Sequence, residues 1–160
     1  RHNSEEEAWK SIDLLHLTTQ TSNLMQHLLE KAEIELRLHF PDEPLPRIYG
    51  NVGEIEQVFL NLLINAQQAM PEGGRIDIEL GEGNGGVIAQ IRDTGEGISK
   101  ENLARIFEPF FTTREEQGGT GLGLSIIYGI VDKHNGVIEV KSQKGKGTTF
   151  TLRFPTDRNA

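Results

Sequence analysis

The 160-residue sequence contains no cysteine, so it can form neither disulfides nor thiolate metal sites. That absence favours a cytoplasmic domain, whether or not the parent protein is anchored in a membrane. No apolar run approaches the roughly 20 residues that span a bilayer, and no signal peptide opens the chain. Because the chain begins at Arg1 rather than at a methionine, we expect a piece of a longer protein.

An excess of basic residues is missing too. The formal net charge of −8 argues against a nucleic-acid partner, because nucleic-acid-binding proteins usually present a basic stripe. An apolar content of 36% and a charged content of 25% are ordinary for a globular protein, and the length suits one domain with a real core. We therefore expect no nucleic-acid partner and no direct membrane contact.

The sequence lacks a GxxxxGK[ST] phosphate loop, but it has two other glycine clusters, at 95–97 and 118–123. Glycine occurs where backbone must approach a ligand closely, and the first cluster follows the carboxylate of Asp93. The second cluster runs into an apolar helical pattern, and the start of a helix favours bound anions. Together they predict a nucleotide site, with the polar segment 112–117 as its mobile lid.

Hydrophobic periodicity predicts an α+β two-layer sandwich, in which a mixed sheet of about five strands is packed on one face by three helices. Residues 1–10 are expected to be the end of an upstream helix or a disordered linker, and residues 11–160 one domain, with a short edge strand or lead-in near Ile12. Helices are predicted over 18–31, 51–70, 99–106 and 122–134. Strands are predicted over 33–40, 47–49, 75–80, 87–92, 137–141 and 149–154.

The helix predicted over 51–70 is apolar almost all round, which indicates burial. Asn51 is its expected N-cap, with Glu54 in the capping-box position. Asn61 and Asn65 lie one turn apart on the same face of this apolar helix. Their amides either hydrogen-bond neighbouring loops or face a polar ligand, with carbonyl oxygens suited to Mg²⁺. The nearby glycine clusters favour the ligand.

The order of the motifs closely resembles the catalytic and ATP-binding domain of sensor histidine kinases, a member of the GHKL superfamily with the Bergerat ATP-binding fold. The matching motifs are Asn61 with Asn65, Asp93-x-Gly95-x-Gly97, Phe107-Glu108-Pro109-Phe110, Gly119-Thr120-Gly121-Leu122-Gly123-Leu124 and Gly145-x-Gly147-Thr148. They correspond to the family's N, G1, F, G2 and G3 boxes, and the resemblance extends from about residue 12 to residue 155. The stretches NLLINAQQAM and EPFFTTR are similar to the nitrogen-regulator and dicarboxylate-sensor type of kinase.

The resemblance implies a role for each residue at the adenine end of an ATP site. Asp93 would accept a hydrogen bond from the adenine amino group. Gly95 and Gly97 would let the backbone come against the base, Ile98 would form the floor of the pocket, and Thr148 would support the adenine end.

The resemblance also implies roles for residues at the phosphate end of the ATP site. Asn65 would coordinate the Mg²⁺ that bridges the phosphates, with Asn61 beside it, directly or through water. Arg114 would reach phosphate oxygens, although a solvated surface charge is the alternative, and Asn61 and Arg114 are the implied catalytic residues. The loop that would wrap the phosphates comprises Gly119, Thr120, Gly121, Leu122, Gly123 and Leu124.

Phe107 and Phe110 would hinge and anchor the lid, or else pack in the core. The sequence departs from the family pattern at Gln68 and Ala69, where a lysine and a tyrosine are common, and its lid is short. The family's phosphoacceptor setting, His-Glu-x-x-x-Pro, is also missing. It is absent at each of the five histidines: His2, His16, His27, His39 and His134.

The resemblance implies transfer of the γ-phosphate of Mg-ATP to a histidine on a separate dimerisation hairpin of the parent kinase, with a response regulator as indirect partner. We expect the fragment to be monomeric, because dimerisation in this family resides mainly in that hairpin. The alternatives are an ATPase of the gyrase, chaperone and mismatch-repair group, or an ATP-regulated binding module such as an anti-sigma factor. The ATPases, and serine kinases of the anti-sigma group, use a glutamate as general base where this chain has Asn61. That difference counts against both alternatives without excluding a pure binder.

Overall fold

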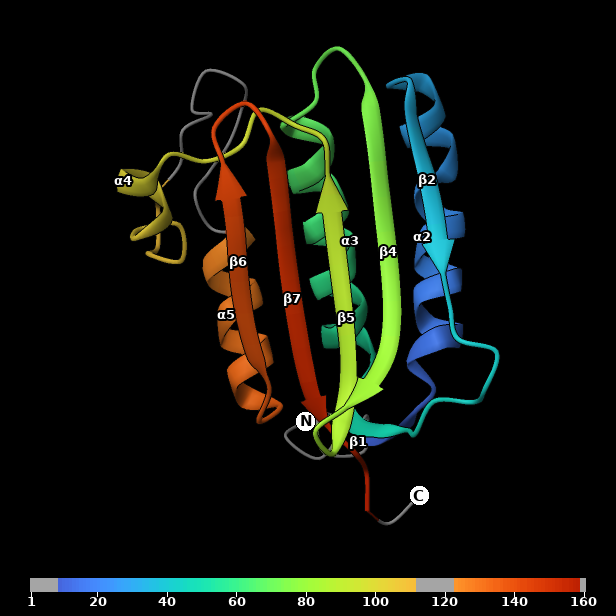
Figure 1. The fold of residues 1–160 in the computed structure, drawn as a ribbon. Helices are drawn as coiled ribbons and strands as arrows, with labels where there is room; N and C mark the ends of the chain where they lie inside the picture. Colours follow the sequence, from blue (N-terminus) through green and yellow to red (C-terminus); the bar gives the residue numbers. More distant parts are fainter. Residues whose placement is uncertain (1–8, 112–122, 159–160) are drawn as a thin grey trace.

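The computed structural model describes residues 9–111 and 123–158. Its main sheet has the strand order β2-β4-β5-β7-β6, in which β2 pairs with β4 in parallel and the other pairs are antiparallel (Figure 1). The strands are β2 (Ile34–His39), β4 (Gly74–Gly83), β5 (Gly86–Asp93), β6 (Val137–Gln143) and β7 (Gly147–Pro155). A separate antiparallel pair is formed by β1 (Trp9–Ile12) and β3 (Ile48–Asn51).

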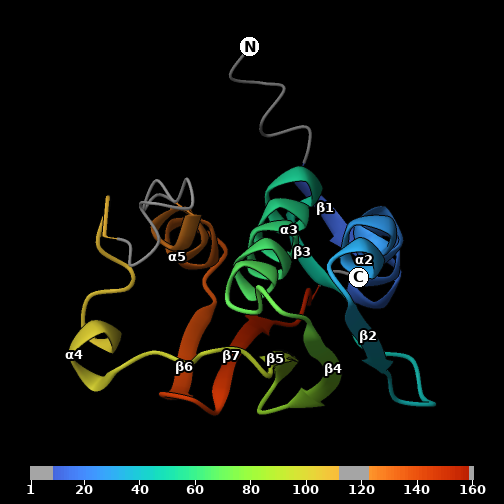
Figure 2. The same ribbon diagram turned by 90° about the horizontal axis from the view of Figure 1, so that it is seen from above.

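Three helices lie on one face of the main sheet and leave its other face open (Figure 2). They are α2 (Leu14–Lys31), α3 (Val52–Gln68) and α5 (Gly123–Lys133). A single short turn of helix, α4 (Lys100–Leu103), lies to the side, beyond β6. The predicted two-layer α+β sandwich with a mixed sheet is confirmed. None of the helices among the described residues is long and apolar enough to cross a membrane.

The alternating pattern of the strands explains why one face is covered. On β4, Ile76 and Ile78 are fully buried against the helices, whereas Arg75 and Glu79 belong to the open face. The helices contribute Ile55 and other apolar side chains of α3 to the same core. Because β5 alternates in the same way, Asp93 ends that strand on the covered side.

The N-terminal part of the chain differs from its prediction. The helix α2 begins at Leu14 rather than Thr18, because the Asp13 side chain caps it by accepting hydrogen bonds from the backbone of Leu15 and His16. The prediction of a helix end or disorder is wrong for Trp9 and Lys10, which form β1. Their hydrogen-bonding partners come from β3, far along the chain, so no local pattern reveals them. Residues 1–8 lie outside the described part.

The cap of α3 is confirmed, but the capping box is only half formed. The Asn51 side-chain oxygen accepts from the Glu54 backbone N–H at 3.0 Å. The Asn51 backbone N–H donates instead to Nε2 of His134 at 3.0 Å, and the Glu54 carboxylate pairs with Lys133 at 3.0 Å. The helix predicted over 99–106 is also shorter than expected, because only α4 is regular helix, with Ser99 as its N-cap.

Candidate nucleotide site

The site is built at one end of the paired helices α3 and α5, which pack side by side on the covered face. At the opposite end, His134 just after α5 is bonded to Asn51 at the start of α3. Eleven residues separate His134 from Gly123, and the same number separates Asn51 from Leu62. With equal rise per residue in antiparallel helices, the start of α5 lies about level with Asn61. Gly123, the end of the 118–123 glycine cluster, is thereby placed about level with Asn61 along α3.

Asp93 ends β5 next to the C-terminal end of α3. Its side chain is only 4% exposed, and Oδ1 accepts a hydrogen bond from the Gly95 backbone N–H at 2.8 Å. The following Glu96 N–H donates to the Ala69 carbonyl at 3.1 Å, and a Cβ atom at Gly95 would lie 2.7 Å from that same oxygen. Since Ala69 follows Asn65 by one helical turn, the loop 93–97 lies about one turn from Asn65.

The turn between β6 and β7 lies directly against this loop. Gly97 has φ +75°, and a Cβ atom there would collide with the Gln143 carbonyl oxygen. Gly147 has φ +94°, and a Cβ atom there would collide with the Asp93 carbonyl oxygen. The Gly145 N–H donates to the Glu96 carbonyl at 2.6 Å. Two stretches of backbone therefore touch, which requires glycine at both contact points.

Ser142 joins the same layer and was missed by the sequence reasoning. Its hydroxyl accepts from the Ile98 backbone N–H at 2.8 Å and donates to the Gly147 carbonyl at 3.0 Å. It also lies 2.7 Å from the hydroxyl of Thr148, which is 5% exposed and stands opposite Asp93 in the sheet. The alternation of Ile138, Val140 and Ser142 could have placed Ser142 on the covered side. Its role depends on strand register, which the sequence leaves open.

The two aromatic residues of the predicted F box have different environments. Phe107 is partly buried against the core, with its ring 5.4 Å from that of Tyr128 on α5. Phe110 is 72% exposed and has φ +67°, so core packing is excluded for Phe110 and holds for Phe107. The Arg105 guanidinium lies 4.6 Å from the Phe111 ring centroid and covers that neighbour.

Not every predicted site residue can be placed. The structure brings together the adenine-end set: Asp93, Gly95, Gly97, Ile98 and Thr148. Asn61 and Asn65 are half-buried on α3, Gly123 begins α5, and Leu124 packs partly against the core. The remaining predicted residues and the predicted lid, 112–117, lie outside the described part. Those residues are Arg114, Gly119, Thr120, Gly121 and Leu122.

The arrangement suits a ligand with a polar aromatic end and an anionic end. A buried carboxylate can accept from an exocyclic amine, while the start of α5 favours anions. Among the described residues, no group of three or more His, Cys, Asp or Glu side chains could hold a metal ion. A magnesium ion brought by phosphates fits nonetheless, because Mg²⁺ keeps its phosphate and water ligands and needs only one or two protein oxygens. The Asn65 amide is a suitable oxygen donor.

Comparison with known proteins agrees with this geometry. Residues 50–158 match the model of the family described as histidine kinase-, DNA gyrase B-, and HSP90-like ATPase. Sensor histidine kinase ZraS of Escherichia coli K12 is 41% identical over 94% of this chain and 32% of its own length. Sporulation kinase A of Bacillus subtilis is 39% identical over 90% of this chain and 23% of its own length. The chain thus spans about a third or less of these relatives.

Solved structures show the same fold. The catalytic domain of histidine kinase ThkA superposes with a TM-score of 0.82 at 32% identity, covering 92% of this chain and 95% of that domain. Full-length ShkA in complex with AMPPNP gives a TM-score of 0.82 at 29% identity, covering 93% of this chain and 31% of ShkA. ThkA in complex with the response regulator protein TrrA gives 0.78 at 29% identity, covering 93% of this chain and 42% of ThkA.

Proposed function

Because this chain belongs to the family of histidine kinase-, DNA gyrase B- and HSP90-like ATPases, and matches sensor histidine kinases over nearly its whole length, we propose that it binds Mg-ATP and transfers the γ-phosphate to a histidine on a separate helical hairpin. Membership of the histidine kinase catalytic domains was predicted from the order of the motifs and is confirmed. The substrate histidine and the transfer step are the proposed part.

The observation that carries the proposal is the junction of three elements at one end of the molecule. The loop 93–97 rests on the end of α3, the β6–β7 turn lies against that loop, and α5 begins about level with Asn61 of α3. Asp93 and Thr148 then lie about two helical turns from Asn61 along the α3 axis. A base at Asp93 and phosphates at the start of α5 match the two ends of a nucleotide.

The proposed contribution of the chain is to position ATP and to neutralise its charge. Asp93 accepts from the adenine amino group, while Asn65 presents its amide oxygen toward the phosphates and Asn61 lies one turn further along α3. A bound Mg²⁺ would be held by Asn65 and would offset phosphate charge. Transfer forms a bond from an imidazole nitrogen to the γ-phosphorus, breaks the bond to the bridging oxygen, and leaves ADP.

The proposed partner is the histidine-bearing hairpin of the parent kinase, with a response regulator as its indirect partner. An exposed apolar set beside the site supports a docked helical surface: Phe110 is 72% exposed, Tyr128 is 50% exposed and Ile126 lies on the same helix as Tyr128. The proposal places the domain in the cytoplasm, where ATP is available. We expect the domain by itself to be a monomer, since the hairpin supplies the dimer contact.

Two rival functions are compatible with the same fold. An ATPase needs a general base near the attacking water. The related ATPases use a glutamate for this role, and this chain has Asn61 at that position. An ATP-regulated binding module needs no base at all. The amide of Asn61 disfavours hydrolysis, and the similarity to sensor histidine kinases favours transfer over pure binding.

One experiment separates the three functions. The domain is dialysed against labelled ATP with Mg²⁺, and the recovered nucleotide is analysed by chromatography before and after addition of the parent hairpin. We expect intact ATP without the hairpin, and base-stable, acid-labile phosphate on the hairpin once it is added. A hairpin with its histidine changed to glutamine is the control. Conversion to ADP without the hairpin would establish an ATPase, and retention of ATP without transfer would establish a binding module.

A further inference from the structure

The strands that hold the adenine-end residues carry a different set of residues on their other side. On the covered side, Asp93 stands beside Thr148, which is joined to Ser142. The next residue on each strand points to the open side, so a second row runs Arg92, Thr149, Lys141. With strands about 4.8 Å apart, Arg92 and Lys141 have Cα atoms about 10 Å apart across Thr149. Their long side chains can converge on one acidic group above that hydroxyl.

Other cations of the open face already have carboxylate partners. Arg37 pairs with Glu35 at 2.9 Å, and Arg153 pairs with Glu139 at 3.2 Å. Arg75 and His39 both bind Asp77, each at 2.8 Å. Within the residues that the structure describes, no hydrogen bond or ion pair holds the side chain of Arg92 or of Lys141. These two cations are therefore available to a ligand.

The carboxylates nearest to Arg92 and Lys141 are bound to other side chains. Asp77 stands opposite Arg92 in the sheet, but its two oxygens are taken by His39 and Arg75. Burial raises the pKa of Asp77, and the hydrogen bonds from His39 and Arg75 outweigh that effect and lower it below its ordinary value. Asp77 is consequently ionised, and its two oxygens are held by the His39 ring and by the Arg75 guanidinium. Glu139, two residues before Lys141, is held by Arg153.

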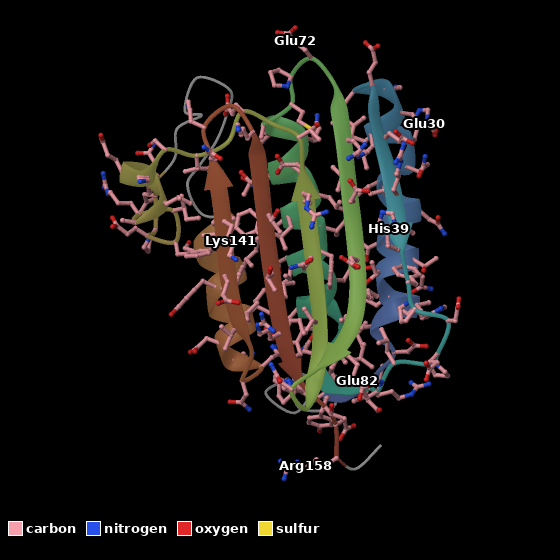
Figure 3. The ribbon with its side chains drawn as sticks, viewed as in Figure 1. Glu30, His39, Glu72, Glu82, Lys141 and Arg158 are labelled. Carbon is pink, nitrogen blue, oxygen red and sulfur yellow. The ribbon has the colours of Figure 1, made fainter. Side chains whose placement is uncertain are left out.

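Two more lysines extend this charge toward the end of the sheet. Lys144 and Lys146 lie exposed in the turn between β6 and β7, where no ion pair holds them among the described residues. Lys141 itself lies on β6 in the view that looks onto the open face (Figure 3). In a chain of net charge −8, four exposed and unmatched cations at one end of one face form a local exception. We call these four residues with Thr149 the open-face basic patch.

We propose that the open-face basic patch docks an acidic segment of a protein partner, with carboxylates received by Arg92 and Lys141. Successive same-side residues of an extended peptide are about 6.6–6.8 Å apart, and the long side chains of Arg92 and Lys141, whose Cα atoms are about 10 Å apart, can lean inward to reach two such carboxylates. A nucleic acid fits less well, because the patch, which consists of Arg92, Lys141, Lys144, Lys146 and Thr149, contains no aromatic ring for base stacking.

The location of the patch gives the docking a consequence. Arg92 directly precedes Asp93, Lys141 directly precedes Ser142, and Thr149 directly follows Thr148. A partner on the open face therefore holds the same three strand ends whose other side forms the candidate adenine site. Any coupling between the two sides is reciprocal, so a nucleotide that alters peptide affinity must have its own affinity altered by the same factor.

The test is a fluorescence-anisotropy titration of a fluorescein-labelled octaglutamate peptide, performed without nucleotide and at low salt. We expect the double variant Arg92→Gln/Lys141→Gln to bind the peptide at least about tenfold more weakly, because two charge-assisted contacts are lost. The control, Lys10→Gln/Lys31→Gln, removes the same net charge from β1 and from the end of α2, outside the main sheet. This control double variant should bind the octaglutamate peptide less than about threefold more weakly than the unsubstituted chain.

Equal weakening in both double variants would mean diffuse electrostatic attraction and would overturn the proposal, as would no weakening in either. Tighter binding of a ten-nucleotide oligothymidylate than of the peptide, lost in the same double variant, would overturn the choice of an acidic protein. Circular dichroism verifies folding, and the single variant Lys141→Gln provides a smaller, parallel loss if the double variant is unstable. Because nucleotide is absent, the outcome is independent of the proposed kinase function.

Discussion

Different kinds of contact are found at the two ends of the α3–α5 pair. At the far end, side chains make the connection: His134 accepts from Asn51 N–H, donates from Nδ1 to the Ile130 carbonyl at 2.7 Å, and stacks on Trp9 with ring centroids 4.4 Å apart. At the site end, backbone joins α3 to the loop 93–97 and that loop to the β6–β7 turn: Glu96 N–H binds the Ala69 carbonyl, and Gly145 N–H binds the Glu96 carbonyl.

Because of this difference, we expect the far end to govern stability and the site end to govern ligand binding. A buried, fully hydrogen-bonded imidazole, only 4% exposed, fixes the two helices relative to each other. Backbone contacts through glycines hold the loop 93–97 while keeping bulky side chains away from a ligand. We therefore expect substitutions of site-end side chains to change nucleotide affinity with little change in stability, and substitutions at the far end to do the reverse.

The largest expected effect is on ligand affinity, from Asp93→Asn. The asparagine amide is uncharged and cannot accept the hydrogen bond from the adenine amino group as the carboxylate does. The affinity for ADP should therefore fall by about a hundredfold or more. The fold should survive, because the amide oxygen can still accept from Gly95 N–H. Isothermal titration calorimetry measures the affinity.

The matched control for this variant is Glu79→Gln, the same chemical change on the open face of β4. It should leave ADP affinity within about twofold, since surface substitutions away from a site have small effects. Unchanged affinity in Asp93→Asn would remove Asp93 from the nucleotide site.

The next effect concerns stability at the site end, where crowding and backbone strain can be separated. Gly97→Ala should lower the free energy of unfolding by about 3 kcal/mol, because the new methyl group meets the Gln143 carbonyl in addition to the φ strain. Gly145 has φ +83° but open space around it, so Gly145→Ala should cost only about 1 kcal/mol. Urea denaturation measures the free energy of unfolding of both variants. Equal losses would show that backbone strain alone, without crowding, accounts for the destabilisation.

At the far end, His134→Ala should lower the free energy of unfolding by about 2–3 kcal/mol, because it leaves the Asn51 N–H without its acceptor and removes the stack on Trp9. ADP affinity should stay within about twofold at a temperature where the variant is folded, since a distant substitution leaves the site contacts in place. His27→Ala on the exposed side of α2 is the control. A tenfold loss of affinity in His134→Ala would show that the far end controls the site.

A smaller effect is expected for Asn65→Ala, which tests the metal contact. Affinity for ATP in the presence of Mg²⁺ should fall about tenfold, while affinity without Mg²⁺ should change less than about threefold, because only the metal-bridged contact is lost. Calorimetric titrations with Mg²⁺ and with EDTA provide the comparison. Equal losses in the two conditions would rule out Asn65 as the metal ligand.

The smallest expected effect concerns the ion pair at the far end of the α3–α5 pair. Lys133 pairs with Glu54 at 3.0 Å, but its side chain is well exposed. Lys133→Ala should therefore cost no more than about 0.5–1 kcal/mol of unfolding free energy in urea denaturation. A loss as large as that of His134→Ala would mean that the ion pair, rather than the buried imidazole, holds the helices together.

Much of the fold was predictable because its signals are local. The alternation of Ile76, Ile78 and Leu80 predicted a one-sided strand, and Asn51 predicted the start of α3. Helix and strand bounds shifted at several ends, and α4 is shorter than the predicted helix. Those ends depend on contacts with distant segments, as β1 illustrates through its pairing with β3.

The candidate site divides in the same way. Asp93, Gly95, Gly97 and Thr148 could be named from sequence, because the order of glycine motifs carries the family resemblance. Ser142 and His134 could not, although both are among the best hydrogen-bonded side chains in the structure. A serine in a strand and a histidine after a helix are common, and neither residue type announces a partner.

The sequence by itself determined the family, through the order of its motifs, and most of the helices and strands, through short-range periodicity. The nucleotide-facing residues that it named stay a prediction. Only the tertiary structure decided which strands are neighbours and in what register. Register set Thr148 opposite Asp93, set Ser142 opposite Thr148, and left Arg92 and Lys141 as a pair on the other side. The physical reason is that pairing between strands depends on the burial of whole faces at once, and no stretch of local sequence contains that information.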